Sequence, residues 1–335
     1  MTSPSPGRPA KRATILDVAA AAGVSRQTVT RAMNDMPGIK QETRERVKEL
    51  ALELGYTPSR YAKGLVQGSR TSVGLAIPDL TNPYFPAFAS SVVEMATRRG
   101  WNVVVDDFGH GSGSSLDAVQ RLAPHVDAVI GYLGSHAADA QSLLGRRPLV
   151  VLDDPEALAA GGISFDYAYA ARLGLERLVG AGRTAIAYLD AGPASQLSAR
   201  GAAFTRAAED RGIGIVVVRA SESAEAAGYA VESLLDDYPA MDGLLAFNDV
   251  MAAGALKALA ASGRSVPQDC AVIGMDGIPL GLLVTPELTT LSLDLRDVGR
   301  TAVDLLAGLL TDAVLPGSPE ARLTLRHELV IRGSA

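Results

Sequence analysis

From Ser72 to the end of the chain, short apolar runs alternate with amphipathic segments, and this alternation limits the fold more than any other feature. The apolar runs predict strands at 73–77, 102–106, 127–132, 149–153, 184–189, 214–218, 243–247 and 271–275. Helical patterns between most of these runs lie near 84–99, 115–123, 167–180, 198–211, 224–236 and 249–262. Apolar strands separated by helices are typical of a parallel α/β sheet with both faces covered. We therefore predict two Rossmann-like subdomains, completed by short runs near 289–293 and 323–332.

Residues 14–33 show a different pattern, that of two short helices joined by a tight turn at Gly23. Glycine adopts the positive φ that such a turn needs, and Ser25 is suited to cap the second helix. A third helix is predicted over 41–54, and its buried stripe consists of Val47, Leu50, Ala51 and Leu54. These predictions place a small all-α domain ahead of the α/β body.

The second of these helices carries Arg26, Gln27 and Arg31 with few acidic residues beside them. A short helix of this kind fits a DNA major groove, where long side chains hydrogen-bond base edges. Residues 1–70 contain 12 Lys and Arg against 6 Asp and Glu, and the remainder contains 19 against 31, so the net charges are +6 and −12. A basic head on an acidic body favours a DNA-binding module joined to a second domain, although charge alone leaves open a merely solvated basic helix.

Several classes of protein are disfavoured by what the sequence lacks. Cys270 is the single cysteine, so no intramolecular disulfide can form and a zinc site with cysteine ligands is not expected. The first residues lack the apolar stretch of a signal peptide, and no run reaches the roughly 18 apolar residues that span a membrane. We expect a cytoplasmic protein with no membrane partner.

Catalytic and cofactor motifs are missing as well. Metal-ligand spacing is absent from the histidines, which are His110, His125, His136 and His327. The Gly- and Ser-rich loop from Gly109 lacks the third glycine of a dinucleotide-binding motif, and there is no P-loop. We therefore expect no enzyme activity, metal or cofactor. A ligand-responsive DNA-binding protein is favoured over a solute-binding protein, which needs an export signal, and over an α/β enzyme.

Several sequence blocks occur in an order and spacing that carry a family resemblance. They are Thr14-Ile-Leu-Asp-Val-Ala with the following Gly-Val-Ser, Leu54-Gly-Tyr-Thr-Pro, Ile77-Pro-Asp-Leu-Thr-Asn-Pro-Tyr-Phe, Phe247-Asn-Asp, Ile273-Gly-Met-Asp-Gly and Thr285-Pro-Glu-Leu-Thr-Thr-Leu. From Thr14 to about Arg332 the chain resembles the LacI/GalR family of bacterial transcription repressors. The resemblance implies an all-α helix-turn-helix DNA-binding domain and an α/β periplasmic-binding-protein-like body of two Rossmann-like subdomains. It also implies a homodimer on a pseudopalindromic double-stranded DNA operator and a small-molecule effector, often a sugar, between the subdomains.

The same resemblance implies a division of the chain into domains. A disordered basic tail spans 1–12, the helix-turn-helix domain spans 13–58, and a hinge spans 59–70. The effector-binding and dimerisation domain spans 71–335. Within it, the N-subdomain is expected at about 71–164 and 292–318, and the C-subdomain at about 165–291 and 319–335.

DNA contacts follow from the family motif, residue by residue. Arg26, Gln27 and Arg31 would read bases, whereas phosphate contacts would come from Thr14, Ser25, Thr28 and Asn34. Leu65 matches the hinge leucine that is wedged into the minor groove, with Ala62 packed beside it. Further expected DNA contacts are Lys40, Tyr56 and Ser59. Lys40 departs from the Ser or Thr that commonly caps the third helix, and Gly64 weakens the hinge as a helix, so we expect the hinge to fold on DNA.

Effector contacts are carried over in the same way. The cleft would be lined by Tyr84, Phe85, Asp153, Arg200, Asn248 and Asp276. Carboxylates that accept hydroxyl groups and an arginine that donates to oxygens suit a polyhydroxylated ligand. Two departures are visible: the segment Ser221-Glu-Ser replaces a common aromatic wall, and Phe165-Asp replaces a common Asp-Asn pair. The first departure predicts a more polar site, or one closed by another aromatic residue.

Overall fold

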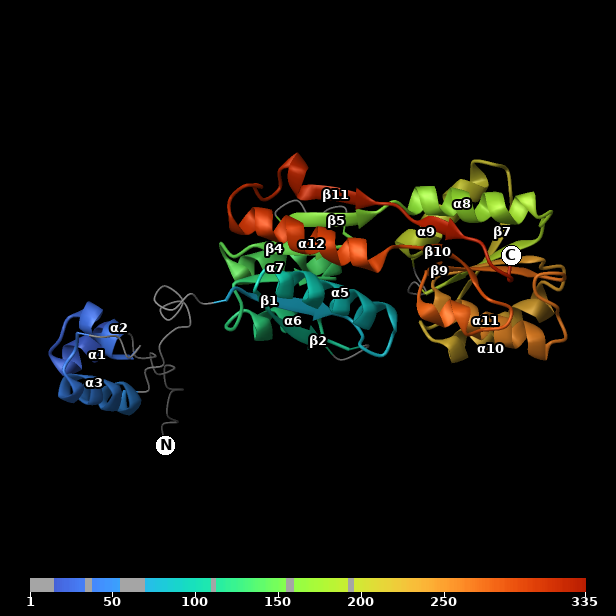
Figure 1. Cartoon of the computed structure of the whole chain (residues 1–335). Coiled ribbons are helices and arrows are strands. Elements are labelled where there is room, and N and C mark those ends of the chain that lie inside the picture. Colours follow the sequence, from blue (N-terminus) through green and yellow to red (C-terminus); the bar gives the residue numbers. More distant parts are fainter. Residues whose placement is uncertain (1–14, 34–37, 55–69, 110–112, 155–159, 192–195) are drawn as a thin grey trace, which may run out of the picture. The chain divides into compact units, whose positions relative to one another are not determined.

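The computed structural model describes residues 15–33, 38–54, 70–109, 113–154, 160–191 and 196–335. The chain divides into two units, residues 1–71 and residues 72–335 (Figure 1). Several predicted features lie outside the described residues and stay predictions: the tail 1–12, the hinge 59–69, Thr14, Asn34, Tyr56, Ser59, Ala62 and Leu65.

The first unit contains the predicted three-helix arrangement, with α1 (Ile15–Ala22), α2 (Arg26–Met33) and α3 (Gln41–Glu53). Gly23 forms the turn with a φ of 67°, and the Ser25 hydroxyl caps α2 by accepting from the Thr28 amide at 3.1 Å. The small core consists of Val18, Ala19, Ala22, Val29, Ala32, Val47 and Ala51. Leu54, predicted as the last residue of the buried stripe, is 41% exposed. The helix ends at Glu53, so Leu54 lies just beyond it.

The second unit begins with a parallel sheet in the order β11-β5-β4-β3-β1-β2. Its strands are β1 (Ser72–Ile77), β2 (Asn102–Asp107), β3 (Ala128–Gly131), β4 (Leu149–Leu152), β5 (Gly161–Phe165) and β11 (Arg322–Leu325). One face packs against α5 (Tyr84–Arg98) and α12 (Leu295–Leu310), and the other against α6 (Ser115–Leu122) and α7 (Ala137–Leu144). The short helices η1 (Gly134–His136) and η3 (Pro319–Ala321) precede α7 and β11.

The second sheet has the order β12-β10-β9-β8-β6-β7, and β12 is antiparallel to β10. Its strands are β6 (Ile186–Asp190), β7 (Ile215–Arg219), β8 (Gly243–Ala246), β9 (Ala271–Asp276), β10 (Thr289–Ser292) and β12 (Glu328–Val330). One face packs against α8 (Tyr167–Gly180) and α9 (Ala199–Glu209), and the other against α10 (Ala224–Asp237) and α11 (Asp249–Ala261). A short helix, η2 (Pro279–Leu282), follows β9.

The chain passes between the two sheets after β5, after β10 and after β11 (Figure 1). The predicted crossing at 318/319 is therefore wrong: β11 pairs in parallel with β5, so residues 319–325 belong to the first sheet and the last crossing lies at 326–327. The crossing predicted at 164/165 falls one residue early, because Phe165 is the last residue of β5.

Three elements, β5, α7 and α12, were not predicted as a strand or helix of their own. The β5 segment Gly-Gly-Ile-Ser-Phe contains too few apolar residues to read as a buried strand, and only its neighbours β4 and β11 define it. The edge strand β2 also departs from the expected pattern, since Val104 and Val105 are 39% and 41% exposed. Among the described residues, no helix combines the length and the apolar character needed to cross a membrane.

The start of α3 lacks a side-chain cap, as the sequence predicts. Lys40 occupies the N-cap position with an extended backbone, and its side chain makes no capping hydrogen bond. Replacing Lys40 with Ser is expected to stabilise α3 by about 1 kcal/mol, because a hydroxyl at this position accepts a backbone N–H of the first turn.

Hydrogen exchange of the α3 amides in the full chain measures this gain, which corresponds to exchange slowed roughly fivefold. Lys40→Ala removes the same charge without supplying an acceptor and serves as the control. Equal exchange rates in the Ser and Ala variants would contradict the prediction.

Candidate ligand cleft and DNA-reading helix

A cavity of about 230 Å³ lies between the two sheets of the second unit. It is lined by Asn82, Tyr84, Phe85, Tyr132, Asp153, Tyr167, Ser198, Ala199, Arg200, Glu222, Phe247 and Asp276. These residues follow the carboxyl ends of strands or begin the next helix, which is where open α/β sheets bind ligands. Five of the six predicted effector residues line this one cavity.

Arg200 is the central cation of the cavity. It lies in the first turn of α9, and the helix is fixed there because the Ser198 hydroxyl accepts from the Gly201 amide at 2.9 Å. Arg200 Nη1 donates to the Phe247 carbonyl at 2.6 Å and to Asp276 Oδ1 at 3.1 Å. Its guanidinium carbon lies 4.5 Å from the centre of the Phe247 ring. The guanidinium is therefore held in one orientation, with an aromatic face against it.

Two aspartates of the cavity have a positive φ, a backbone conformation that residues other than glycine rarely adopt. Asp153 has a φ of 59° and Asp276 a φ of 116°, and each follows or ends a strand. Such strained positions cluster at functional sites, where the surrounding structure holds them in place. Asp153 Oδ2 also accepts a hydrogen bond from the Tyr167 hydroxyl at 2.8 Å.

Burial controls the protonation of these carboxyl groups. It raises the pKa of Asp153 above its usual value. Burial also raises the pKa of Asp276 to about 8; Arg200 opposes this rise, whereas Asp249 and Glu222 add to it. Asp276 is therefore a carboxyl that can pass between donor and acceptor near neutral pH.

Asn248 has a different position from the one predicted. It is 1% exposed and caps α11 by accepting from the Met251 amide at 2.8 Å. Its Nδ2 donates to Glu222 Oε1 at 2.8 Å, so Asn248 supports a residue of the cavity and is absent from the lining itself. The reason is local, because the N-cap position turns its side chain back toward the helix.

Seven lining residues were not predicted: Asn82, Tyr132, Tyr167, Ser198, Ala199, Glu222 and Phe247. Asn82 and Phe247 lie inside sequence blocks that carry the family resemblance. Their position beside predicted cavity residues could have indicated that they line the cavity. Glu222 was noticed only as a departure from an aromatic wall. Glu222 lies in the lining, and Phe247 and Tyr167 supply aromatic faces there, so the cavity has features of both alternatives.

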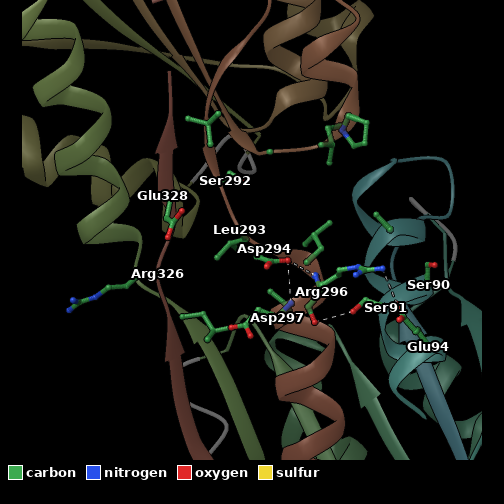
Figure 2. Close-up of a pocket in the computed structure, with 18 residues that line it drawn as sticks. Ser90, Ser91, Glu94, Ser292, Leu293, Asp294, Arg296, Asp297, Arg326 and Glu328 are labelled. Atoms are coloured by element: carbon green, nitrogen blue, oxygen red, sulfur yellow. Dashed lines mark hydrogen bonds and ion pairs between the residues drawn. The ribbon is translucent and has the colours of Figure 1, made fainter. Parts of the chain in front are cut away.

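A larger hollow of about 750 Å³ lies beside the crossing segments (Figure 2). Several of its polar residues are paired: Arg296 approaches Glu94 at 3.5 Å, and Ser91 Oγ donates to the Arg296 carbonyl at 3.2 Å. Arg326 pairs with Asp166 at 3.1 Å. None of the predicted effector residues lines this hollow, so the cavity around Arg200 is the candidate ligand site.

The first unit presents the second candidate surface, on α2. Arg26, Gln27 and Arg31 are exposed, whereas Val29 and Ala32 are buried against α1 and α3. The long polar side chains are thus free to contact DNA while the apolar ones hold the helix. Of the other predicted contacts within the described residues, Ser25 and Lys40 are exposed, and Thr28 is half-buried.

A metal site is not indicated by the part of the chain that the structure describes. No three His, Cys, Asp or Glu side chains among those residues are grouped so that they could hold a metal ion. Cys270, the single cysteine, is buried.

Comparison with known proteins decides the family. The model described as bacterial regulatory proteins, lacI family, matches residues 14–59, and the periplasmic binding protein-like domain matches residues 175–335. The ribose operon repressor of Halalkalibacterium halodurans is 33% identical over 299 residues, which is 88% of this chain and 89% of that protein. The chain belongs to the LacI family. As a member of this family it is a transcriptional regulator that binds DNA.

Solved structures of LacI-family regulators match the fold. The regulator from Arthrobacter sp. FB24 in complex with lactose is 60% identical, covers 79% of this chain and 99% of its own, and has a TM-score of 0.77. The lac repressor dimer bound to operator and the anti-inducer ONPF is 31% identical, covers 97% of this chain and 99% of its own, and has a TM-score of 0.73. The predicted fold class is therefore confirmed.

The raised pKa of Asp276 makes the stability of this regulator depend on pH. An unfolded Asp titrates near 3.9, whereas the folded pKa is about 8, so the folded state binds more protons between these values. The free energy of unfolding therefore falls as the pH rises toward about 8. We predict that Asp276→Asn, which cannot titrate, flattens the fall in melting temperature between roughly pH 6.5 and 8.

Two other buried groups have pKa values below this window. The pKa of Asp249 is raised by burial to about 6, and that of His327 is lowered by burial to about 3. Asp236→Asn, at an exposed position on α10, is the matched control. Identical slopes for the wild type and Asp276→Asn would refute the prediction.

Proposed function

We propose that this LacI-family protein is a repressor that reads a pseudopalindromic operator with α2 and that a saccharide in the cleft changes its DNA affinity. The observation that carries the proposal is the buried Arg200, joined to Asp276 in a cavity whose walls come from both sheets. A ligand in that cavity contacts both halves at once and so biases their arrangement. As a protein that acts on DNA in a bacterium, it works in the cytoplasm.

The chemistry of the cavity favours a neutral sugar. Asp153, Glu222 and Asp276 supply acceptors for hydroxyl groups, and Arg200 supplies donors for ring or hydroxyl oxygens. Phe247 offers a flat face for the apolar side of a sugar ring. Arg200 is the one cation in this lining, and it is already paired with Asp276 and the Phe247 carbonyl, which disfavours a phosphorylated sugar. The lactose complex of the 60% identical Arthrobacter regulator makes lactose the first effector to test.

Exposed apolar side chains support a homodimer. Tyr229 on α10 is 65% exposed, and Leu282 and Leu283 at η2 are 53% and 80% exposed. Val104 and Val105 add apolar area on the edge strand β2. Exposed apolar residues mark an interaction site where they form a contiguous patch. A two-fold dimer brings two copies of α2 to two half-sites. The similar lac repressor was solved as a dimer bound to operator.

The reading role of α2 predicts loss of sequence-specific binding. Gln27→Ala and Arg31→Ala should each weaken binding to the native operator by roughly 5- to 150-fold, because each side chain can discriminate a base by about 1–3 kcal/mol. Mobility shift with a fragment of the promoter the protein controls measures the effect, with a scrambled fragment as reference. Arg98→Ala, which removes an exposed cation from the second unit, is the control. Unchanged sequence-specific binding in both variants would contradict the assignment of Gln27 and Arg31 as base-reading residues.

The effector role of the cleft predicts binding of lactose to the full chain. Arg200→Lys keeps the charge but loses the planar contact with Phe247 and Asp276, so we expect the lactose Kd to rise by at least about 30-fold. Isothermal titration calorimetry measures the change, and Arg172→Lys, on the exposed side of α8, is the control. Tighter binding of a phosphorylated sugar than of lactose would contradict the proposed ligand class.

A further inference from the structure

Glu222 connects residues from both halves of the cleft. It lies between β7 and α10, and its Oε1 accepts from Asn248 Nδ2 at 2.8 Å within its own half. The same oxygen accepts from Asn82 Nδ2 at 2.9 Å. Asn82 belongs to the other half, because it lies between β1 and α5. One carboxylate oxygen therefore holds an amide from each side of the cavity.

The Asn82–Glu222 contact lies far from the segments that cross between the two halves. The crossing segments leave from β5, β10 and β11, which lie at or near one edge of each sheet. Glu222 follows β7, the opposite edge of the second sheet, and Asn82 follows β1, next to the opposite edge of the first. A rotation about the crossings displaces these two loops more than the residues beside the crossings. The Asn82–Glu222 hydrogen bond is thus placed where opening of the cleft would break it first.

Asn82 is held so that its amide group points across the cleft. Its Oδ1 accepts from the Tyr84 amide at 3.1 Å at the start of α5, and the residue is 9% exposed. Another cross-cleft hydrogen bond, from Tyr167 to Asp153, lies close to the first crossing because Tyr167 follows β5 by two residues. It therefore stays in place over a wider range of rotations.

We propose that Glu222 is the clamp of the cleft and determines its specificity. Its Oε1 ties Asn82 to Asn248, while its Oε2 accepts a hydroxyl group of the bound saccharide. A carboxylate makes stronger hydrogen bonds than a neutral acceptor, so one side chain joins ligand recognition to closure. The inference rests on the proposed effector role of the cavity, and it explains why an acidic residue lies where an aromatic wall was expected.

A donor–acceptor swap tests the clamp in the full chain. Asn82→Asp keeps the acceptor for the Tyr84 amide but sets a second carboxylate against Glu222, so the melting temperature should fall and the lactose Kd should rise about tenfold. Glu222→Gln keeps an oxygen for both amides and loses only the second carboxylate oxygen. Its melting temperature should fall less than that of Asn82→Asp, because two neutral hydrogen bonds replace two charge-assisted ones, and its lactose Kd should be about tenfold higher.

The double variant gives the decisive result. With both substitutions, the new glutamine amide can donate to the new aspartate while its oxygen still accepts from Asn248, so the clamp is re-formed. We expect the melting temperature of Asn82→Asp to be restored and the lactose Kd to stay about tenfold above wild type. Additive effects, with a Kd about 100-fold higher and no recovery of the melting temperature, would overturn the proposal.

Two controls separate the clamp from general charge effects. Glu225→Gln removes an exposed carboxylate from the first turn of α10, and Asn102→Asp adds one at an exposed position of β2. Both should leave the lactose Kd within about twofold of wild type. The melting temperatures of the two single variants and the double variant are measured without ligand, so they test the clamp independently of lactose. A wild-type chain that does not bind lactose therefore counts against the proposed function alone.

Discussion

The parallel arrangement of the strands is the constraint on which the functional cleft depends. All the described strand pairings except that of β10 with β12 are parallel. The carboxyl ends of the parallel strands therefore lie at the same edge of each sheet. Polar residues that follow those ends are gathered there without being close in sequence. Because the chain crosses between the sheets three times, the two edges are held facing one cavity.

Within that cavity, a buried guanidinium sets the positions of its neighbours. A charge removed from water must be paired and hydrogen-bonded, and Arg200 meets this need with Asp276 and the Phe247 carbonyl. Phe247 follows β8 and Asp276 ends β9, so that half of the cleft is ordered around one cation. The first sheet contributes Asp153, Phe85 and Tyr132 to the same lining, and no cation. A ligand that fills the cavity therefore meets Arg200 from one half and the acceptor Asp153 from the other.

Much of this arrangement was predictable, and the particular errors show why the rest was not. Tyr84, Phe85, Asp153, Arg200 and Asp276 line one cavity, since each lies at a strand end or helix start that local pattern identifies, and their contact with an effector stays a prediction. Asn248 also begins a helix, yet its side chain caps that helix and contacts Glu222 in place of the cavity. The last crossing was misplaced because β11 is recognisable only by its register with β5.

By itself, the sequence determined the features that neighbours along the chain control: the three helices of the first unit, the uncapped start of α3, and most strands and helices of the body. Periodicity and capping act over a few residues, so they can be read directly. Tertiary structure alone decided the pairing of Asn82 with Glu222, which are 140 residues apart, and the strained backbone at Asp153 and Asp276. Those features depend on contacts that exist only after the sheets are formed and face each other.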